Sequence, residues 1–124
     1  MAELSIRLRG VNEADLSVEL LYWEGCPSHP DALRMLRSLL DELGRPDVVI
    51  RLTQVDTEAQ AASLRFPGSP TLRVNGADLM PAPRDAPIGL TCRVYRLRDG
   101  RPSPTPDLEA LRSALRRALA ADGT

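Results

Sequence analysis

A strand–helix–strand pattern near the start of the chain limits the available folds more than any other feature. Residues 17–23 are almost continuously apolar and β-prone, which predicts a strand covered on both faces. Residues 31–43 carry leucines at three- and four-residue steps and predict an amphipathic helix, with Pro30 in its first turn and Gly44 at its end. Residues 48–55 predict a second strand. Two strands joined in this way are expected to be parallel, with a right-handed crossover.

Two further segments extend this pattern. Residues 57–64 predict a short helix, because Thr57 and Gln60 have the spacing of a capping box at its start. Residues 71–74 predict a third strand, and the Asn75-Gly76 dipeptide that follows is typical of tight turns.

The last third of the chain predicts a loop, a strand and a helix. Residues 77–89 hold three prolines without periodicity, and a loop of this length suggests function. Residues 90–98 alternate and predict a fourth strand, antiparallel to the third, and Thr105 is expected to cap a final helix. The predicted fold class is α/β, with a central four-stranded mixed sheet in the order β-α-β-α-β-β-α. Three polar loop residues are expected to be solvated, with a place in a substrate cleft as the alternative: Asp78, Arg84 and Asp85.

These elements divide the chain into an N-terminal arm of residues 1–16 and one domain of residues 17–121. A total length of 124 residues suits a single domain. Within the arm, residues 4–9 alternate apolar and polar side chains, which favours an extra strand, and a frayed terminus is the alternative.

The net charge and the hydropathy of the chain argue against nucleic-acid and membrane partners. Sixteen basic residues, all Arg, and 17 acidic residues give a net charge of −1, so nucleic acid is not an expected partner. No stretch reaches the roughly 20 apolar residues of a membrane span, and the first residues lack the features of a secretory signal. We therefore expect a cytoplasmic protein that has no membrane partner and no cofactor.

Two local motifs carry a resemblance to a known family. Cys26 follows the first predicted strand and precedes the long helix, and Gly68-Ser69-Pro70-Thr71 leads into the third strand. Together with the order of elements, they resemble the thioredoxin superfamily, in which a cis proline lies beside the reactive cysteine. The resemblance covers about residues 17–120. The chain is also similar to a small bacterial group of thioredoxin-like proteins that carry Gly-Cys-Pro, Gly-Ser-Pro-Thr and a later Cys-Arg-X-Tyr, here Cys92-Arg93-Val94-Tyr95.

The chain departs from the Cys-X-X-Cys dithiol motif of that superfamily. Cys26-Pro27-Ser28-His29 stands in its place, so a local dithiol cycle is not available. The resemblance implies a single N-terminal active-site Cys26, with His29 and Pro70 in the catalytic group and Pro27, Ser69 and Thr71 against the substrate. It also implies that the backbone of Ser69 points toward the reactive sulfur, where it can pair with an extended peptide or a glutathione-like substrate.

The position of Cys26 favours its thiolate form. A helix N-terminus offers unpaired N–H groups and a partial positive charge, and catalytic thiols at such positions have pKa values of roughly 3.5–7.5. A pKa near 6 would make Cys26 about 90% thiolate at pH 7. Protonated His29, one turn on, would favour the thiolate further, and neutral His29 could act as a base. The alternative is an inert, buried Cys26 and a surface His29.

Cys92 has two interpretations. If residues 90–98 pair antiparallel with the third strand, Cys92 lies at the sheet end away from Cys26 and has a structural role. The alternative is that the 77–89 loop brings it to the site as a resolving thiol. A Cys26–Cys92 disulfide would then close a loop of about 65 residues, worth roughly 4 kcal/mol in the chain-entropy model.

The expected function is thiol–disulfide exchange through a mixed disulfide on Cys26, with a small thiol or a protein disulfide as partner. One alternative is a binding module of the same fold without redox turnover. Another is capture of a thiophilic metal or organometal by Cys26, His29 and Cys92, although their spacing is not that of a zinc site.

Overall fold

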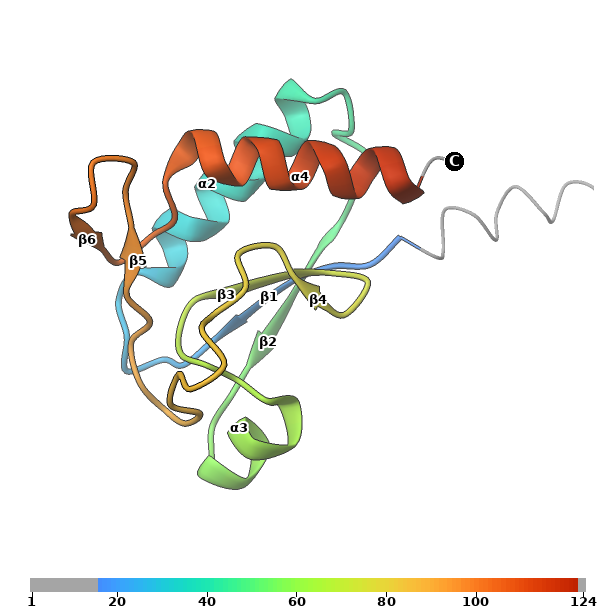
Figure 1. The fold of residues 1–124 in the computed structure, drawn as a ribbon. Coiled ribbons are helices and arrows are strands. Elements are labelled where there is room, and N and C mark those ends of the chain that lie inside the picture. The colour runs from blue at the N-terminus through green and yellow to red at the C-terminus, as the bar shows by residue number, and fades with distance from the viewer. Residues whose placement is uncertain (1–15, 123–124) are drawn as a thin grey trace, which may run out of the picture.

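The computed structural model describes residues 16–122 and confirms the α/β fold class (Figure 1). The extra strand predicted over residues 4–9 lies outside the described residues. The elements in chain order are β1 (Val18–Tyr22), α2 (His29–Glu42), β2 (Ile50–Gln54), α3 (Glu58–Leu64), β3 (Thr71–Val74), β4 (Ala77–Asp78), β5 (Tyr95–Arg96), β6 (Pro102–Ser103) and α4 (Leu108–Asp122).

The central sheet has four strands in the order β2-β1-β3-β4. β1 is parallel to β2 and antiparallel to β3, which confirms the predicted mixed sheet. Leu20 of β1 lies between Leu52 of β2 and Leu72 of β3. This register aligns the end of β1 with the start of β3, so the turn after β1 and the loop before β3 meet at one edge of the sheet.

Helices cover both faces of the sheet, with α2 and α4 on one side and α3 on the other (Figure 1). Successive residues of a strand point to opposite faces. Leu20 accordingly belongs to the larger hydrophobic cluster, with residues of α2 and α4, and Leu21 packs with Ala61 of α3 and with Phe66. This double burial explains the continuous apolar run that predicted β1.

The helix ends follow from local sequence. Pro30 lies in the first turn of α2, as predicted, and Gly44 follows its end with a φ of 81°. The capping box of Thr57 and Gln60 is present at the start of α3. The predicted cap of the last helix was wrong, because the carboxylate of Asp107, not Thr105, accepts the Ala110 amide at 3.0 Å.

The fourth strand was predicted in the wrong place. Asn75 and Gly76, with φ values of 53° and 83°, turn the chain so tightly that Ala77–Asp78 pairs with β3 at once. Pro81, which has no amide hydrogen, follows soon after. Residues 90–98 lie outside this sheet, and their Tyr95–Arg96 portion pairs instead with β6.

Among the described residues, no helix combines the length and the apolar character needed to cross a bilayer.

Candidate thiol site

Cys26 lies in the turn that joins β1 to α2. Its amide donates a hydrogen bond to the carbonyl of Trp23 at 3.0 Å. The Trp23 ring covers Gly25 so closely that a Cβ atom there would come within 2.4 Å of the ring, so a larger residue would have to displace the ring. Cys26 thus precedes the first turn of α2, as predicted, and it is only 2% exposed.

Polar groups surround the Cys26 sulfur. Its Sγ lies 3.3 Å from Ser28 Oγ and donates to the main-chain oxygen of Ser69 at 3.5 Å. Cys92 is bridged to Ser69, whose carbonyl accepts the Cys26 thiol, so the Cys92 side chain lies close to this sulfur. Ser28 is the N-cap residue of α2, yet its hydroxyl makes no capping hydrogen bond. The contact of Ser28 with the Cys26 sulfur could not be expected from the sequence, because a serine before a helix indicates capping.

The two thiols differ in acidity. Burial opposes ionisation of Cys26, but hydrogen bonds from Cys92 and from the side chain and backbone of Ser28 outweigh it and lower the pKa of Cys26. The hydrogen bond with Cys26, burial and the Cys26 charge raise the pKa of Cys92 to about 11. The pair therefore carries its first negative charge on Cys26, while Cys92 keeps its proton.

We expect the two thiols to titrate in separate steps. The first proton leaves below the usual cysteine pKa, and the second leaves with a pKa of about 11. Thiolate absorbance against pH measures both steps, with the Cys26→Ser/Cys92→Ser double variant as the tyrosine baseline. Cys92→Ala should leave one step, at a higher pH than the first step of the wild type, because alanine has no hydrogen to donate to the thiolate. A single joint step at the usual value would contradict this prediction.

The loop before β3 lies against this pair. The Ser69–Pro70 peptide bond is cis, as the resemblance implied. Ser69 donates its amide to the Thr91 carbonyl and accepts the Arg93 amide, both at 2.8 Å, and so forms a parallel bridge with Cys92. The backbone groups that we expected to pair with an extended substrate are therefore occupied by residues 91–93 of the chain itself.

The predicted separation of Cys92 from Cys26 was wrong. It depended on a fourth sheet strand at residues 90–98, whereas the long loop returns the chain to Ser69 and places Cys92 beside the Cys26 sulfur. Cys92 is exposed, Cys26 is buried, and both are free thiols. The arrangement is the one that we gave as the alternative, in which the loop brings a second thiol to the site.

Arg93 and Tyr95 hold this loop in place. Arg93 is 8% exposed, donates to Thr71 Oγ1 at 3.3 Å and to the Met80 carbonyl, and lies 4.6 Å from the centre of the Tyr95 ring. The Tyr95 hydroxyl donates to the Pro70 carbonyl, and burial raises the pKa of Tyr95 to about 12, so the hydroxyl keeps its proton. This role of Tyr95 could not be expected from the sequence, because its partner Pro70 is distant in the chain.

Gly68 allows the close approach between the loop before β3 and the backbone of Arg93. Its φ is +121°, and a Cβ atom there would lie 3.0 Å from the backbone nitrogen of Arg93. Glycine is therefore required both by the backbone conformation and by the close approach of a second chain segment.

The other predicted site residues lie around this pair. Thr71 is fully buried, and its hydroxyl donates to the Gly68 carbonyl at 2.6 Å, whereas Pro27 is exposed. His29 Nδ1 donates to the Cys26 carbonyl at 3.2 Å, and its ring stacks on Tyr22 at 4.2 Å. In residues 16–122, no group of three His, Cys, Asp or Glu side chains is arranged to hold a metal ion.

A cleft of about 1030 Å³, called here the Cys92 cleft, lies on the outer side of the pair. Its walls come from residues 79–87 of the long loop, residues 91–96 and one side of α4. Cys92 lines this cleft. Of the three loop residues considered above, Asp85 lines it, Asp78 pairs with Arg73 at 2.6 Å, and Arg84 is exposed.

A scan against protein-family models finds no match, and searches among curated proteins and solved structures find none either.

Proposed function

We propose that this protein is a thioredoxin-like thiol–disulfide exchange protein whose redox pair is Cys26 and Cys92. The observation that carries the proposal is the contact that both cysteines make with Ser69. The Ser69 carbonyl accepts the Cys26 thiol at 3.5 Å and the Ser69 backbone is bridged to Cys92, so an acidic thiol lies beside one that keeps its proton. Thiol–disulfide exchange needs a thiolate as attacking or leaving group, and Cys26 supplies it.

The reaction balances with a disulfide substrate. The two protein thiols lose two electrons and two protons, a Cys26–Cys92 bond forms and the substrate disulfide breaks. The electrons and protons leave on two substrate thiols. An external thiol reverses the reaction and restores the dithiol. In this proposal Cys92 does the work of the second cysteine that the Cys26-Pro27-Ser28-His29 motif lacks.

Membership of the thioredoxin superfamily is part of the same proposal. The order of elements, the cis Ser69–Pro70 bond and the position of Cys26 at the start of α2 support it. His29 contacts the backbone of Cys26 rather than its sulfur, so we assign it a positioning role in the turn.

Mild oxidation tests the redox pair directly. We expect the intact monomer to lose the mass of two hydrogen atoms, and a reducing thiol to restore it. Cys92→Ser is the control and should show no such loss, because its single thiol has no partner within the chain. If the wild type forms only mixed disulfides or dimers, Cys92 is not the partner of Cys26.

Turnover separates an exchange protein from a binding module of the same fold. With a small disulfide as substrate and a reducing thiol in excess, the wild type should accelerate the reduction of the substrate beyond the rate of the free thiol. A wild type that adds nothing to this background rate would exclude the enzymatic function and leave a binding role.

A further inference from the structure

The Cys92 cleft has the size of a small-molecule site. Its volume of about 1030 Å³ reaches the upper end of the roughly 300–1,000 Å³ range of such sites. Prolines of the long loop and alanines of α4 supply apolar walls, and Cys92 is the cysteine that lines it. A ligand in this cleft would therefore lie beside Cys92, with Cys26 behind it.

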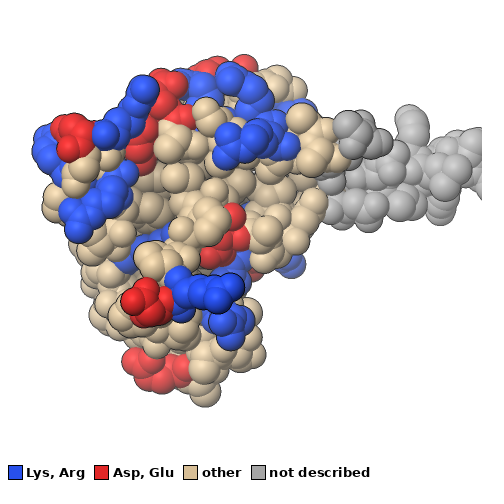
Figure 2. Space-filling model, viewed as in Figure 1, with Lys and Arg blue, Asp and Glu red and all other residues tan. Residues whose placement is uncertain are grey.

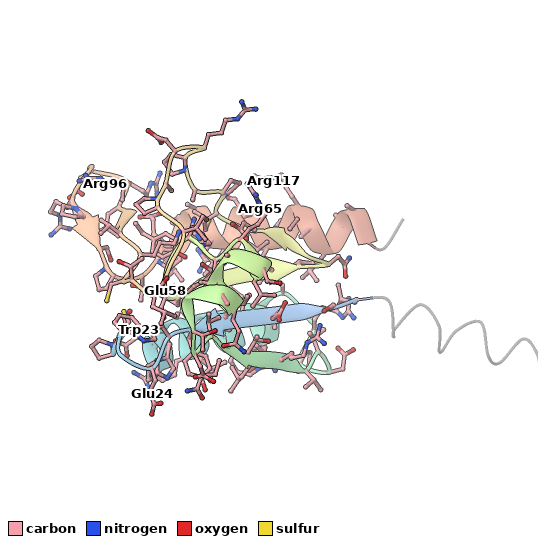
Figure 3. All side chains as sticks on the ribbon, turned by 90° about the horizontal axis from the view of Figure 1, so that it is seen from below. Trp23, Glu24, Glu58, Arg65, Arg96 and Arg117 are labelled. Carbon is pink, nitrogen blue, oxygen red and sulfur yellow. The ribbon has the colours of Figure 1, made fainter. Side chains whose placement is uncertain are left out.

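Arginines from two elements line this cleft. Arg96 of β5 and Arg117 of α4 line it and are exposed, and neither forms an ion pair within residues 16–122. Arg93 also lines it, and Asp85 is the acidic residue of its wall. Figure 2 shows basic side chains over α4 and at the β5–β6 hairpin, interspersed with acidic ones. Figure 3 shows Arg96 and Arg117 on these two elements. A carboxylate complements this charge.

The exposure of Cys92 and the stability of the Cys26 thiolate as a leaving group both favour attack on the Cys92 sulfur. An incoming thiolate reacts with whichever sulfur of a disulfide it can reach, and the thiol of lower pKa leaves faster. Cys92 is exposed, whereas Cys26 is 2% exposed. Attack on Cys92 also releases Cys26, whose thiolate the hydrogen bond from Ser28 stabilises.

We propose that the Cys92 cleft binds a small thiol that carries a carboxylate, and that this thiol forms its mixed disulfide with Cys92 rather than with Cys26. The inference rests on the proposed function and reverses the roles that the sequence suggested. The incoming thiolate bonds to Cys92 Sγ, the Cys26–Cys92 bond breaks and Cys26 leaves as a thiolate. A second thiolate attacks the bound substrate sulfur, releases its disulfide, and leaves Cys92 to take up a proton.

Two single-cysteine variants test which sulfur receives the substrate. With dithiodipropionate as the probe, Cys26→Ser should gain the mass of one mercaptopropionate and keep it, because no internal thiolate removes it. Cys92→Ser should gain it at least about tenfold more slowly while folded, because Cys26 is buried. In denaturant both variants should react at similar rates, which controls for the thiols themselves. Faster and lasting modification of folded Cys92→Ser would overturn the assignment.

Disulfide probes of different charge test whether the cleft prefers a substrate that carries a carboxylate. In Cys26→Ser, dithiodipropionate should react about tenfold faster than the neutral bis(hydroxyethyl) disulfide, and cationic cystamine should be slowest. Arg96→Gln/Arg117→Gln should abolish this order, and added salt should weaken it. Arg98→Gln/Arg116→Gln is the matched control, since it removes equal charge from exposed arginines outside the cleft and should keep the order.

Equal rates for the three probes, or an order of rates that survives Arg96→Gln/Arg117→Gln, would overturn the proposal that the Cys92 cleft binds a carboxylate through these arginines. These results are distinguishable from a failure of the proposed function. Modification of the single-cysteine variants needs no turnover, so it tests the role of Cys92 even in a protein that does not turn over. Normal turnover with modification on Cys26 would overturn this inference alone.

Discussion

Cys26→Ser should lower the turnover of thiol–disulfide exchange by at least about 100-fold, equivalent to about 2.7 kcal/mol in activation free energy. Cys92 can still form a mixed disulfide in this variant, but the internal thiolate is gone and only the slower attack of an external thiol can cleave that disulfide. Steady-state reduction of a small disulfide, with a reducing thiol in excess, measures the loss. A variant that keeps more than a tenth of wild-type turnover would show that Cys26 is dispensable.

Ser28→Ala is the matched control for this loss. It removes the hydroxyl 3.3 Å from Cys26 Sγ but leaves the sulfur, the backbone of Ser28 and the hydrogen bond from Cys92 in place. We therefore expect a smaller effect on turnover, below about tenfold, since one of several stabilising hydrogen bonds is lost. If Ser28→Ala were as damaging as Cys26→Ser, the loss would reflect disruption of the turn rather than of the thiolate.

Arg93→Met should lower the free energy of unfolding by about 2–3 kcal/mol, a large share of the roughly 5–15 kcal/mol of a typical domain. The substitution keeps much of the side-chain volume but removes the donors to Thr71 and to the Met80 carbonyl. A buried acceptor left without its donor costs about 1–3 kcal/mol, and relief from burying a charge offsets part of the loss. The midpoint of urea unfolding measures the change.

Arg96→Met provides the comparison for Arg93→Met. Arg96 lies three residues further along, is exposed, and bonds to the Gly100 carbonyl at 3.2 Å. Its substitution should change the free energy of unfolding by no more than about 0.5 kcal/mol. Equal losses from both variants would mean that the contacts of Arg93 beneath the loop do not stabilise the fold.

The sequence predicted the elements whose signals are local. Both faces of β1 are buried, so its apolar run was visible without knowledge of its neighbours. The capping box of α3 and the proline in the first turn of α2 are likewise contained within a few residues. These features were predicted correctly because the interactions that form them join residues close in the chain.

The fourth strand was misplaced because its signal is ambiguous. Arg93 and Tyr95 are buried while Val94 and Arg96 are exposed, which produces the alternation expected of a sheet strand. Here the burial comes from packing against the loop before β3 and not from the central sheet. A short strand such as β4, with two residues, has too little sequence to show any pattern.

The pairing of the two thiols could not be derived from spacing. Cys26 and Cys92 belong to segments that meet only through the path of the long loop, and proline content predicts a loop but not where it goes. The position of Cys26 needed only β1 and α2, which explains why it was predicted correctly. The role of Cys92 needed the tertiary structure.

The close contact at Gly68 has a consequence for recognising other chains of this type. The main chain of Arg93 rests directly on that glycine, so the backbone of a neighbouring loop, rather than the number of intervening residues, fixes where the second thiol stands. We therefore expect changes in the length of the proline-rich loop to be compatible with the same position of Cys92, provided that this contact is kept. A useful search pattern is therefore a glycine before Ser-Pro and a downstream Cys-Arg pair, separated by a gap of any length.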